Sequence, residues 1–186
     1  MYTIRNYASF DKKAVESICL TESTGNLDMD EAILTTFCYY YIDNEPDNCL
    51  VVVNSLNKSV GYIFCAADYC KWRARFYELY LNDSANPITR TMSESTMNAL
   101  APFANEYPAH LHIELLPECQ GQHLGSQLIQ ELIAHLKSKG ISGLMLDVAK
   151  NNTHAQYFYH QNGFHILSSS EQECTMGIHI KEVSHE

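Results

Sequence analysis

Polar and apolar side chains alternate in the segment AHLHIELL, residues 109–116. His110, His112 and Glu114 stand at every second position, so a β-strand places all three on one face. A histidine, or a carboxylate whose pKa is raised by burial, takes a proton from an amine near neutral pH. Two other interpretations stay open, because the spacing also suits a metal site and a hydrogen-bonded structural network beside a solvated cleft.

A turn with two glycines follows this strand and leads into a helix. Pro117 removes a backbone donor from further pairing, and Gly121 and Gly125 bracket the start of the helix. The free N–H groups and the positive dipole end of a helix start attract an anion, and glycine lets that anion approach the backbone closely. By itself, the turn predicts either an anion site, with a pyrophosphate as a natural guest, or a plain structural turn. The apolar residues of the helix lie on one stripe: Leu124, Leu128, Ile129, Leu132, Ile133 and Leu136.

A second motif, NNTHAQYFYHQNGF, covers residues 151–164. Together with the turn it resembles the GNAT superfamily of acyl-CoA-dependent N-acetyltransferases. The pyrophosphate loop of that family reads Gln/Arg-x-x-Gly-x-Gly/Ala and maps onto residues 120–125. The later segment reads Asn-x-x-Ala-x-x-Phe-Tyr-x-x-x-Gly-Phe, and every fixed position is met from Asn152 to Phe164. One position departs from the family pattern, since His123 replaces the first loop glycine and either narrows the phosphate site or donates a hydrogen bond to it.

The resemblance implies an α/β (α+β) fold of the GNAT type, with a single mixed, mostly antiparallel sheet and helices on both faces, in one domain over residues 1–186. It also implies an enzyme, an acyltransferase that moves an acetyl group from acetyl-CoA to a primary amine by direct transfer in a ternary complex. The alternative is a catalytically inactive GNAT-like binding module, which the departure at His123 favours. Within the superfamily, the strand and turn look most like the acetyltransferase-like domain also found appended to O-GlcNAc hydrolases.

The family pattern assigns roles to individual residues. The candidate bases are Glu114, His112 and His110, and Tyr159 is the candidate acid. The His-x-His pair resembles that of members that acetylate arylalkylamines, although its distance to the loop differs by one residue. The expected acetyl-CoA contacts are Leu115, Leu116, Gln120, Gly121, Gln122, His123, Leu124, Gly125, Ser126, Asn152 and Tyr159.

Charge and composition limit the partners. The formal net charge is -10, which argues against nucleic acid, because phosphate contacts need Lys and Arg. No apolar run is long enough to span a bilayer, so no membrane partner is expected. Seven scattered cysteines without CxxC spacing predict a reduced, cytoplasmic protein without a bound metal. The expected acceptor is a small-molecule amine or an amino sugar, with an aminoglycoside and a protein terminus still open, and a homodimer through the C-terminal strands is an open possibility.

The pattern of apolar residues sets the expected elements. Strands are expected at residues 2–7, 49–54, 60–68, 109–116, 143–149, 164–169 and 173–180. Helices are expected at residues 9–20, within 23–42, and at 91–107, 123–140 and 152–162. Residues 69–90 fit an aromatic loop, a helix or both. An aromatic, acidic acceptor pocket is one interpretation of Tyr39, Tyr40, Tyr41, Asp43, Glu45 and Asp68, capped by Trp72 and Tyr77, and the edge of the core is the other.

Overall fold

The computed structural model describes residues 2–180 of the chain. Its strands form one sheet in the order β1-β2-β3-β4-β5-β7-β6. Only β4 and β5 run parallel, and all other neighbours are antiparallel. The strands are β1 Thr3–Asn6, β2 Leu50–Val53, β3 Ser59–Ala66, β4 Ala109–Leu115, β5 Gly143–Ala149, β6 His165–Ser169 and β7 Glu173–His179. The predicted fold class is confirmed; the single domain over residues 1–186 stays a prediction, because residues 1 and 181–186 lie outside the described residues.

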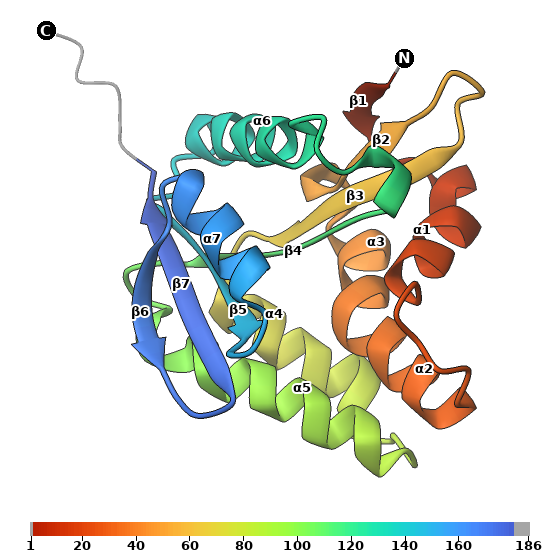
Figure 1. The fold of residues 1–186 in the computed structure, drawn as a ribbon. Helices are drawn as coiled ribbons and strands as arrows, with labels where there is room; N and C mark the ends of the chain where they lie inside the picture. Colours follow the sequence, from red (N-terminus) through yellow and green to blue (C-terminus); the bar gives the residue numbers. More distant parts are fainter. Residues whose placement is uncertain (1, 181–186) are drawn as a thin grey trace, which may run out of the picture.

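Helices cover both faces of this sheet (Figure 1). Helices α6 and α7 pack on one face, and the helices that precede β4 pack on the other. The α-helices are α1 Lys12–Cys19, α2 Leu27–Leu34, α3 Tyr40–Asn44, α4 Tyr69–Phe76, α5 Pro87–Leu100, α6 Leu124–Ser138 and α7 Thr153–Gln161. Two π-helical turns, η2 Thr35–Tyr39 and η4 Tyr77–Leu81, continue α2 and α4. Short 3-10 turns lie at η1 Ser9–Asp11, η3 Pro46–Asn48, η5 Ala101–Phe103 and η6 Pro117–Cys119.

Helices α4 and α5 interrupt the chain between β3 and β4, although these strands are neighbours in the sheet. The ambiguous residues 69–90 therefore contain α4, η4 and the start of α5. The expected helix at residues 91–107 begins earlier, at Pro87, because the Asn86 side chain accepts from the amides of Ile88 and Thr89 and proline is tolerated at the first helical position. The helix also ends earlier than expected, at Leu100.

Strands β4 and β5 separate soon after they meet (Figure 1). Their parallel pairing covers only Ala109 with Leu144 and His110 with Met145. On its other edge β4 stays paired with β3, and the Leu116 amide donates to the Val60 carbonyl at 3.0 Å. Hydrogen-bonded positions alternate along an antiparallel pair, so the backbone groups of Ile113 and Leu115 face away from β3. They line the gap between β4 and β5.

Candidate active site

The predicted polar face of β4 is present in the structure. His110 and His112 contact Tyr41 and Tyr62, which belong to the core cluster under the helices that precede β4. Leu111 packs in the opposite cluster, under α6 and α7, with Ile113 and Leu115 against it. The strand alternation therefore predicted the two faces correctly.

His110 lies at the closed end of this face. Its side chain is 2% exposed, and its Nε2 lies 3.1 Å from the Tyr41 hydroxyl. The Trp72 ring stands edge-on at 4.3 Å between centroids. Burial lowers the pKa of His110 to about 3, because a protonated imidazole loses its hydration there. The imidazole is therefore neutral at pH 7.

His112 lies nearer the open end of the same strand. Its Nδ1 lies 3.1 Å from the Tyr62 hydroxyl, and its ring stacks on Phe37 of η2 with the centroids 4.8 Å apart. Burial lowers the pKa of His112 to about 4. The two contacts fix the ring plane of His112: Tyr62 comes from β3 of the sheet, and Phe37 comes from η2.

Glu114 is the last member of the predicted set. Its Oε1 accepts from the Leu115 amide at 3.3 Å. Burial raises the pKa of Glu114, and the nearby Glu22 carboxylate raises it further. A carboxylate of this kind is a stronger base than an exposed glutamate.

Tyr159 approaches the site from α7, on the other side of the gap. Its side chain is 8% exposed, and burial raises its pKa, with a further contribution from the Glu114 charge. The Tyr159 hydroxyl is a proton donor at neutral pH for that reason. Glu114 and Tyr159, predicted as base and acid, thus lie close enough for the charge of one to affect the proton affinity of the other.

The loop before α6 presents a run of free backbone donors. In the described part of the chain, the amides of residues 121–126 have no hydrogen-bond acceptor, whereas Gln127 N closes the first helical bond to the His123 carbonyl. Free amides at the positive end of a 15-residue helix attract an anion. This cradle contains Gly121, Gln122, His123, Leu124, Gly125 and Ser126, which were all expected from the sequence, and it fits a pyrophosphate.

Backbone conformation explains two positions of the loop. His123 has φ 60° and ψ 10°, the left-handed conformation in which glycine is favoured. His123, which stands where the family pattern has glycine, therefore has the backbone conformation of a glycine position. Its side chain is exposed. At Gly125 an added Cβ would lie 2.9 Å from Phe158 Cζ and 3.3 Å from Leu115 Cδ1. Glycine thus lets α6, α7 and β4 meet at the gap.

The other residues expected to contact acetyl-CoA differ in whether their polar groups are already hydrogen-bonded within the protein. Gln120 Nε2 donates to the Leu115 carbonyl at 3.2 Å, so Leu115 already binds an amide in this gap. Both backbone groups of Leu116 are engaged, with Val60 and with Cys119. Asn152 caps α7 by accepting from the Ala155 amide at 3.0 Å. All of the expected acetyl-CoA contacts, including those of Leu116 and Asn152, stay predictions.

Sequence reasoning missed one acidic side chain beside the gap. Asp147 of β5 lies two residues after Met145, the last partner of β4. Burial raises its pKa to about 7, and the neighbouring Glu173 raises it further. Thr175 Oγ1 donates to Asp147 Oδ1 at 3.4 Å. The available signal was the single charge in the apolar strand GLMLDVA.

The aromatic residues of the possible acceptor pocket mostly fill the core. Tyr40, Tyr41 and Trp72 are buried, at 4%, 2% and 0% exposure. The acidic residues of that set have local partners, since Asp43 pairs with Lys12, Glu45 accepts from the Ala67 amide and Asp68 caps α4. The core-edge interpretation is therefore correct for these residues, because α4 and α5 fold over them.

No helix within residues 2–180 is long and apolar enough to cross a membrane. The seven cysteines are free thiols. Six of them have a raised pKa, mainly through burial: Cys19, Cys38, Cys49, Cys65, Cys119 and Cys174. A raised pKa keeps a thiol protonated and weakly nucleophilic at neutral pH.

Comparison with known proteins agrees with the fold. The Acetyltransferase (GNAT) family model matches residues 15–164. The crystal structure of SsHAT aligns with TM-score 0.82 and 28% identity, over 97% of this chain and 99% of that one. The ribosomal-protein-S18-alanine N-acetyltransferase from Escherichia coli aligns with TM-score 0.60 and 16% identity, over 100% and 97%. A GNAT superfamily phosphinothricin acetyltransferase (Pat) from Sinorhizobium meliloti, solved in complex with AcCoA, aligns with TM-score 0.59 and 12% identity, over 100% and 92%.

The last two structures share the fold at low identity, whereas the family match covers most of the chain and both motifs. The free amides before α6 supply the cradle that a CoA pyrophosphate needs. The chain therefore belongs to the acetyltransferase (GNAT) family and is an N-acetyltransferase that uses acetyl-CoA.

Proposed function

We propose that the enzyme transfers the acetyl group directly to a primary amine in a ternary complex, with Glu114 as the base and Tyr159 as the acid. The observation that carries this proposal is the position of Glu114. Glu114 stands near the end of β4, and its Oε1 accepts from the Leu115 amide beside the β4–β5 gap. With its raised pKa, this position fits a group that takes a proton from an ammonium. Acetyl-CoA supplies the activated acetyl group.

Glu114 is a better base than either histidine. A base must hold a proton near working pH, and the lowered pKa values of His110 and His112, about 3 and about 4, make both weak proton acceptors. His112 is a positioning residue in this proposal, because Tyr62 and Phe37 fix its ring beside Glu114. His110 is structural, since aromatic side chains enclose it.

Tyr159 holds the proton that the departing sulfur needs. Its raised pKa keeps the Oη protonated at pH 7, and its hydroxyl donates to no other described residue. Forming the amide removes two protons from the ammonium, and Glu114 takes the first of them before the attack. When the carbon–sulfur bond breaks, Tyr159 Oη gives its proton to the sulfur, and the second proton of the nitrogen returns Tyr159 to its neutral form. Glu114 releases its proton to solvent before the next cycle.

A covalent intermediate on the enzyme is not needed. The Cys19 thiol has Glu114 and Tyr62 as neighbours, and burial raises its pKa to about 11. Such a thiol is protonated at neutral pH and is a weak nucleophile. A direct attack by the amine therefore fits this chain better than a two-step route.

The identity of the acceptor is part of the proposal only at the level of class. A small-molecule amine or an amino sugar fits the acidic balance of the chain and the carboxylates Glu114 and Asp147 beside the gap. The likeness to the domain appended to O-GlcNAc hydrolases remains a hypothesis from the sequence. A cytoplasmic location and a homodimer also remain predictions.

Initial-rate kinetics test the proposal. A panel of primary amines and amino sugars is screened for release of free CoA, and the best acceptor is varied against acetyl-CoA. We expect intersecting double-reciprocal lines, because both substrates bind before transfer. Parallel lines, with acetyl trapped on the protein after acetyl-CoA alone, would overturn direct transfer. A primary amine that reacts while its N,N-dimethyl analogue does not would identify the reacting group.

A further inference from the structure

His112 presents one ring nitrogen that the fold leaves without a partner. Its Nδ1 lies 3.1 Å from the Tyr62 hydroxyl, and Phe37 covers one face of the ring. In the described part of the chain its Nε2 has no hydrogen-bond partner, and unlike Nδ1 of His110 it is not sealed in the core. The side chain as a whole is half-buried. Nε2 is therefore the polar atom of His112 that remains open to solvent.

The surroundings of His112 decide which of its two nitrogens carries the proton. Burial lowers the pKa of His112 to about 4, so the ring is neutral at pH 7 and holds a single N–H. Burial also raises the pKa of Tyr62 well above its ordinary value, so its hydroxyl keeps its proton. The other polar neighbour of that hydroxyl is the Cys19 thiol, and sulfur is a weak acceptor.

The hydrogen bond between Tyr62 and His112 therefore has one favoured direction. A phenol is a better donor than a neutral imidazole, and an imidazole nitrogen is a better acceptor than a phenol oxygen. Tyr62 then donates and Nδ1 accepts, which leaves the N–H of the ring at Nε2. The free nitrogen of His112 is thus a donor that is held in a fixed direction.

The strand places this donor beside the proposed base. His112 and Glu114 are alternate residues of β4, so their side chains share one face and stand roughly 6–7 Å apart along the strand. β4 separates from β5 after His110, the last paired residue, so no described strand covers that edge of β4 at either position. An amine at Glu114 brings the atoms next to its nitrogen toward His112 Nε2.

A donor at this position distinguishes between classes of amine. A neutral imidazole N–H bonds to an oxygen that accepts, whereas a second ammonium group has only donors. The spacing between the two side chains suits an oxygen that is separated from the nitrogen by about two or three carbon atoms. Amino alcohols and amino sugars have this arrangement, and alkylamines and diamines lack the oxygen.

We propose that His112 determines acceptor specificity by donating a hydrogen bond from Nε2 to an oxygen of the acceptor, which favours amino sugars and amino alcohols. This inference rests on the proposed function, because it takes Glu114 as the group that receives the amine. Tyr62 is a positioning residue that acts through His112 by keeping the proton at Nε2. An acceptor without the oxygen leaves this N–H without a partner in the complex, which weakens its binding.

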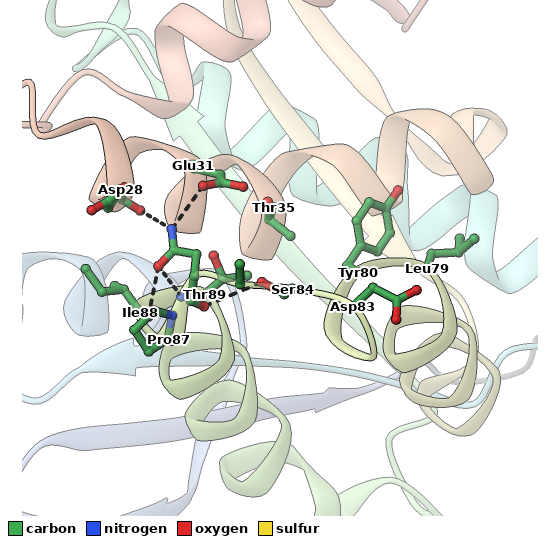
Figure 2. Close-up of a pocket in the computed structure, with 12 residues that line it drawn as sticks. Asp28, Glu31, Thr35, Leu79, Tyr80, Asp83, Ser84, Pro87, Ile88 and Thr89 are labelled. Carbon is green, nitrogen blue, oxygen red and sulfur yellow. Dashed lines mark hydrogen bonds between the residues drawn. The ribbon is translucent and has the colours of Figure 1, made fainter.

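The open pocket between α2, η4 and the start of α5 lies elsewhere in the molecule (Figure 2). None of its lining residues belongs to β4. Its Asn86 side chain bonds within the protein, to the Asp28 carbonyl at 2.7 Å and to Glu31 Oε2 at 3.1 Å. A substitution of Asp83 in this lining is therefore a control for the location of the acceptor.

Matched acceptors measure the preference for an oxygen. Ethanolamine is compared with propylamine, and glucosamine with cyclohexylamine, so that hydroxyl groups are present in one member of each pair. An oxygen also lowers the pKa of the ammonium group. The preference is therefore taken as the ratio of the two kcat/KM values, and this ratio is compared between enzyme variants.

Two substitutions of His112 separate its nitrogens. His112→Asn keeps an oxygen that accepts from Tyr62 but has no group at the position of Nε2, so the preference should fall about tenfold. His112→Gln carries an amide N–H to the position of Nε2 and should restore most of it. Acetyl-CoA affinity should stay unchanged in both variants, which shows that they fold. A wild-type ratio in His112→Asn would overturn the inference.

Control variants locate the effect. His160→Asn makes the same substitution at an exposed position of α7 and should keep the wild-type ratio. Asp83→Asn should keep it as well. A changed ratio in Asp83→Asn, with none in His112→Asn, would place the acceptor in the pocket of Figure 2 and refute the role of His112.

Nitrogen NMR of isotope-labelled histidine gives a readout that does not depend on turnover. Protonated and unprotonated ring nitrogens resonate far apart, and the signals of His112 are those that His112→Asn removes. We expect a proton on Nε2 and none on Nδ1 at pH 7. Tyr62→Phe should give a mixture of both forms together with a smaller preference for the hydroxyl amine. A proton on Nδ1 in the wild type would refute the inference whatever the kinetics show.

The source of the oxygen is tested with one further acceptor. Alaninamide carries a carbonyl beside its amine, as a peptide N-terminus does. We expect His112→Asn to lower kcat/KM for glucosamine more than for alaninamide. A loss with alaninamide alone would replace the amino sugar with a peptide terminus and overturn the proposed acceptor class.

Failure of the proposed function would look different from failure of this inference. If no amine releases CoA, or if Glu114→Gln keeps the wild-type rate, the proposed function falls and the role of His112 falls with it. An active enzyme that depends on Glu114 and keeps its hydroxyl preference in His112→Asn would retain the proposed function and lose only this inference.

Discussion

His112 and Asp147 each lie two residues beyond the last pair that joins β4 to β5, on the same face of the sheet. The strands separate at this point, so the two side chains stand on opposite sides of the gap. The pKa of His112 is lowered to about 4, and that of Asp147 is raised to about 7. Burial thus favours the neutral form of both side chains. The face of the sheet that holds His112 and Asp147 therefore carries less charge than its residue types suggest.

Replacing Glu114 tests the proposed base. We expect Glu114→Gln to lower kcat/KM for the amine about 10²–10⁴-fold, the usual contribution of a general base, with little change in acetyl-CoA affinity. The acidic limb of the pH profile should disappear, since Glu114 must be ionised to accept a proton. Initial rates across pH measure both effects, with the exposed Glu118→Gln as a matched control. A variant with the wild-type rate and profile would show that the base lies elsewhere.

The Tyr159 hydroxyl can be removed without disturbing a described hydrogen bond. We therefore expect Tyr159→Phe to keep its free energy of unfolding within about 0.5 kcal/mol and to lose at least about tenfold in kcat. Chemical denaturation and steady-state rates give the two values. Tyr157→Phe is the control, because Tyr157 is 65% exposed on the same helix. An unchanged kcat would contradict the acid role.

Close packing at Gly125 predicts a steric effect on acetyl-CoA binding. An added Cβ would lie 2.9 Å from Phe158 Cζ, so Gly125→Ala should cost about 1–3 kcal/mol of folding free energy. Acetyl-CoA affinity should fall as well, because α6 and its free amides move. Thermal unfolding with and without acetyl-CoA measures both. The second substitution Phe158→Leu should restore part of the loss; if it does not, the clash is not the cause.

His123 is held in a conformation that costs an ordinary residue about 1 kcal/mol. We expect His123→Gly to be at least as stable as wild type in urea, and His123→Val to be less stable. Acetyl-CoA affinity distinguishes the two roles considered for the imidazole. Equal or tighter binding by His123→Gly means that the side chain narrows the phosphate site, whereas weaker binding in both variants means that it donates to the phosphate.

Asp147 makes stability depend on pH. Its folded pKa is about 7, against an ordinary value of 3.8, so the native state holds a proton that the unfolded state loses between these values. Stability therefore falls as pH rises from about 4 to 7 and is flat above that. Between pH 5 and pH 8, wild type should lose about 2 kcal/mol more than Asp147→Asn. Urea denaturation at both pH values checks this, and equal losses would contradict the raised pKa.

The sequence predicted the fold because its signals were local. Alternation placed His110, His112 and Glu114 on one face, and the apolar stripe of residues 124–136 predicted α6. The burial of a side chain was not a local signal, because it depends on segments that are distant in the sequence. His110 is enclosed by Trp72 and Tyr41, which come from segments far away in the chain, so its spacing alone did not distinguish a base from a core histidine.

Two other features required the folded chain. The role of Asp147 depends on where β4 leaves β5, and no motif marks that point. The left-handed backbone of His123 also depends on the loop it closes, and the residue type alone did not predict that conformation.

The segment of residues 67–108 enters and leaves the sheet at one point. The Tyr69 amide donates to the Pro108 carbonyl at 2.7 Å, so a hydrogen bond joins the two ends of this segment beside β3 and β4. The six-residue register between those strands, from Gly61 with Leu115 to Ala66 with His110, is independent of what lies between. The segment can therefore change in length without shifting the register of β4, provided that Tyr69, Trp72 and Phe76 keep their places in the core.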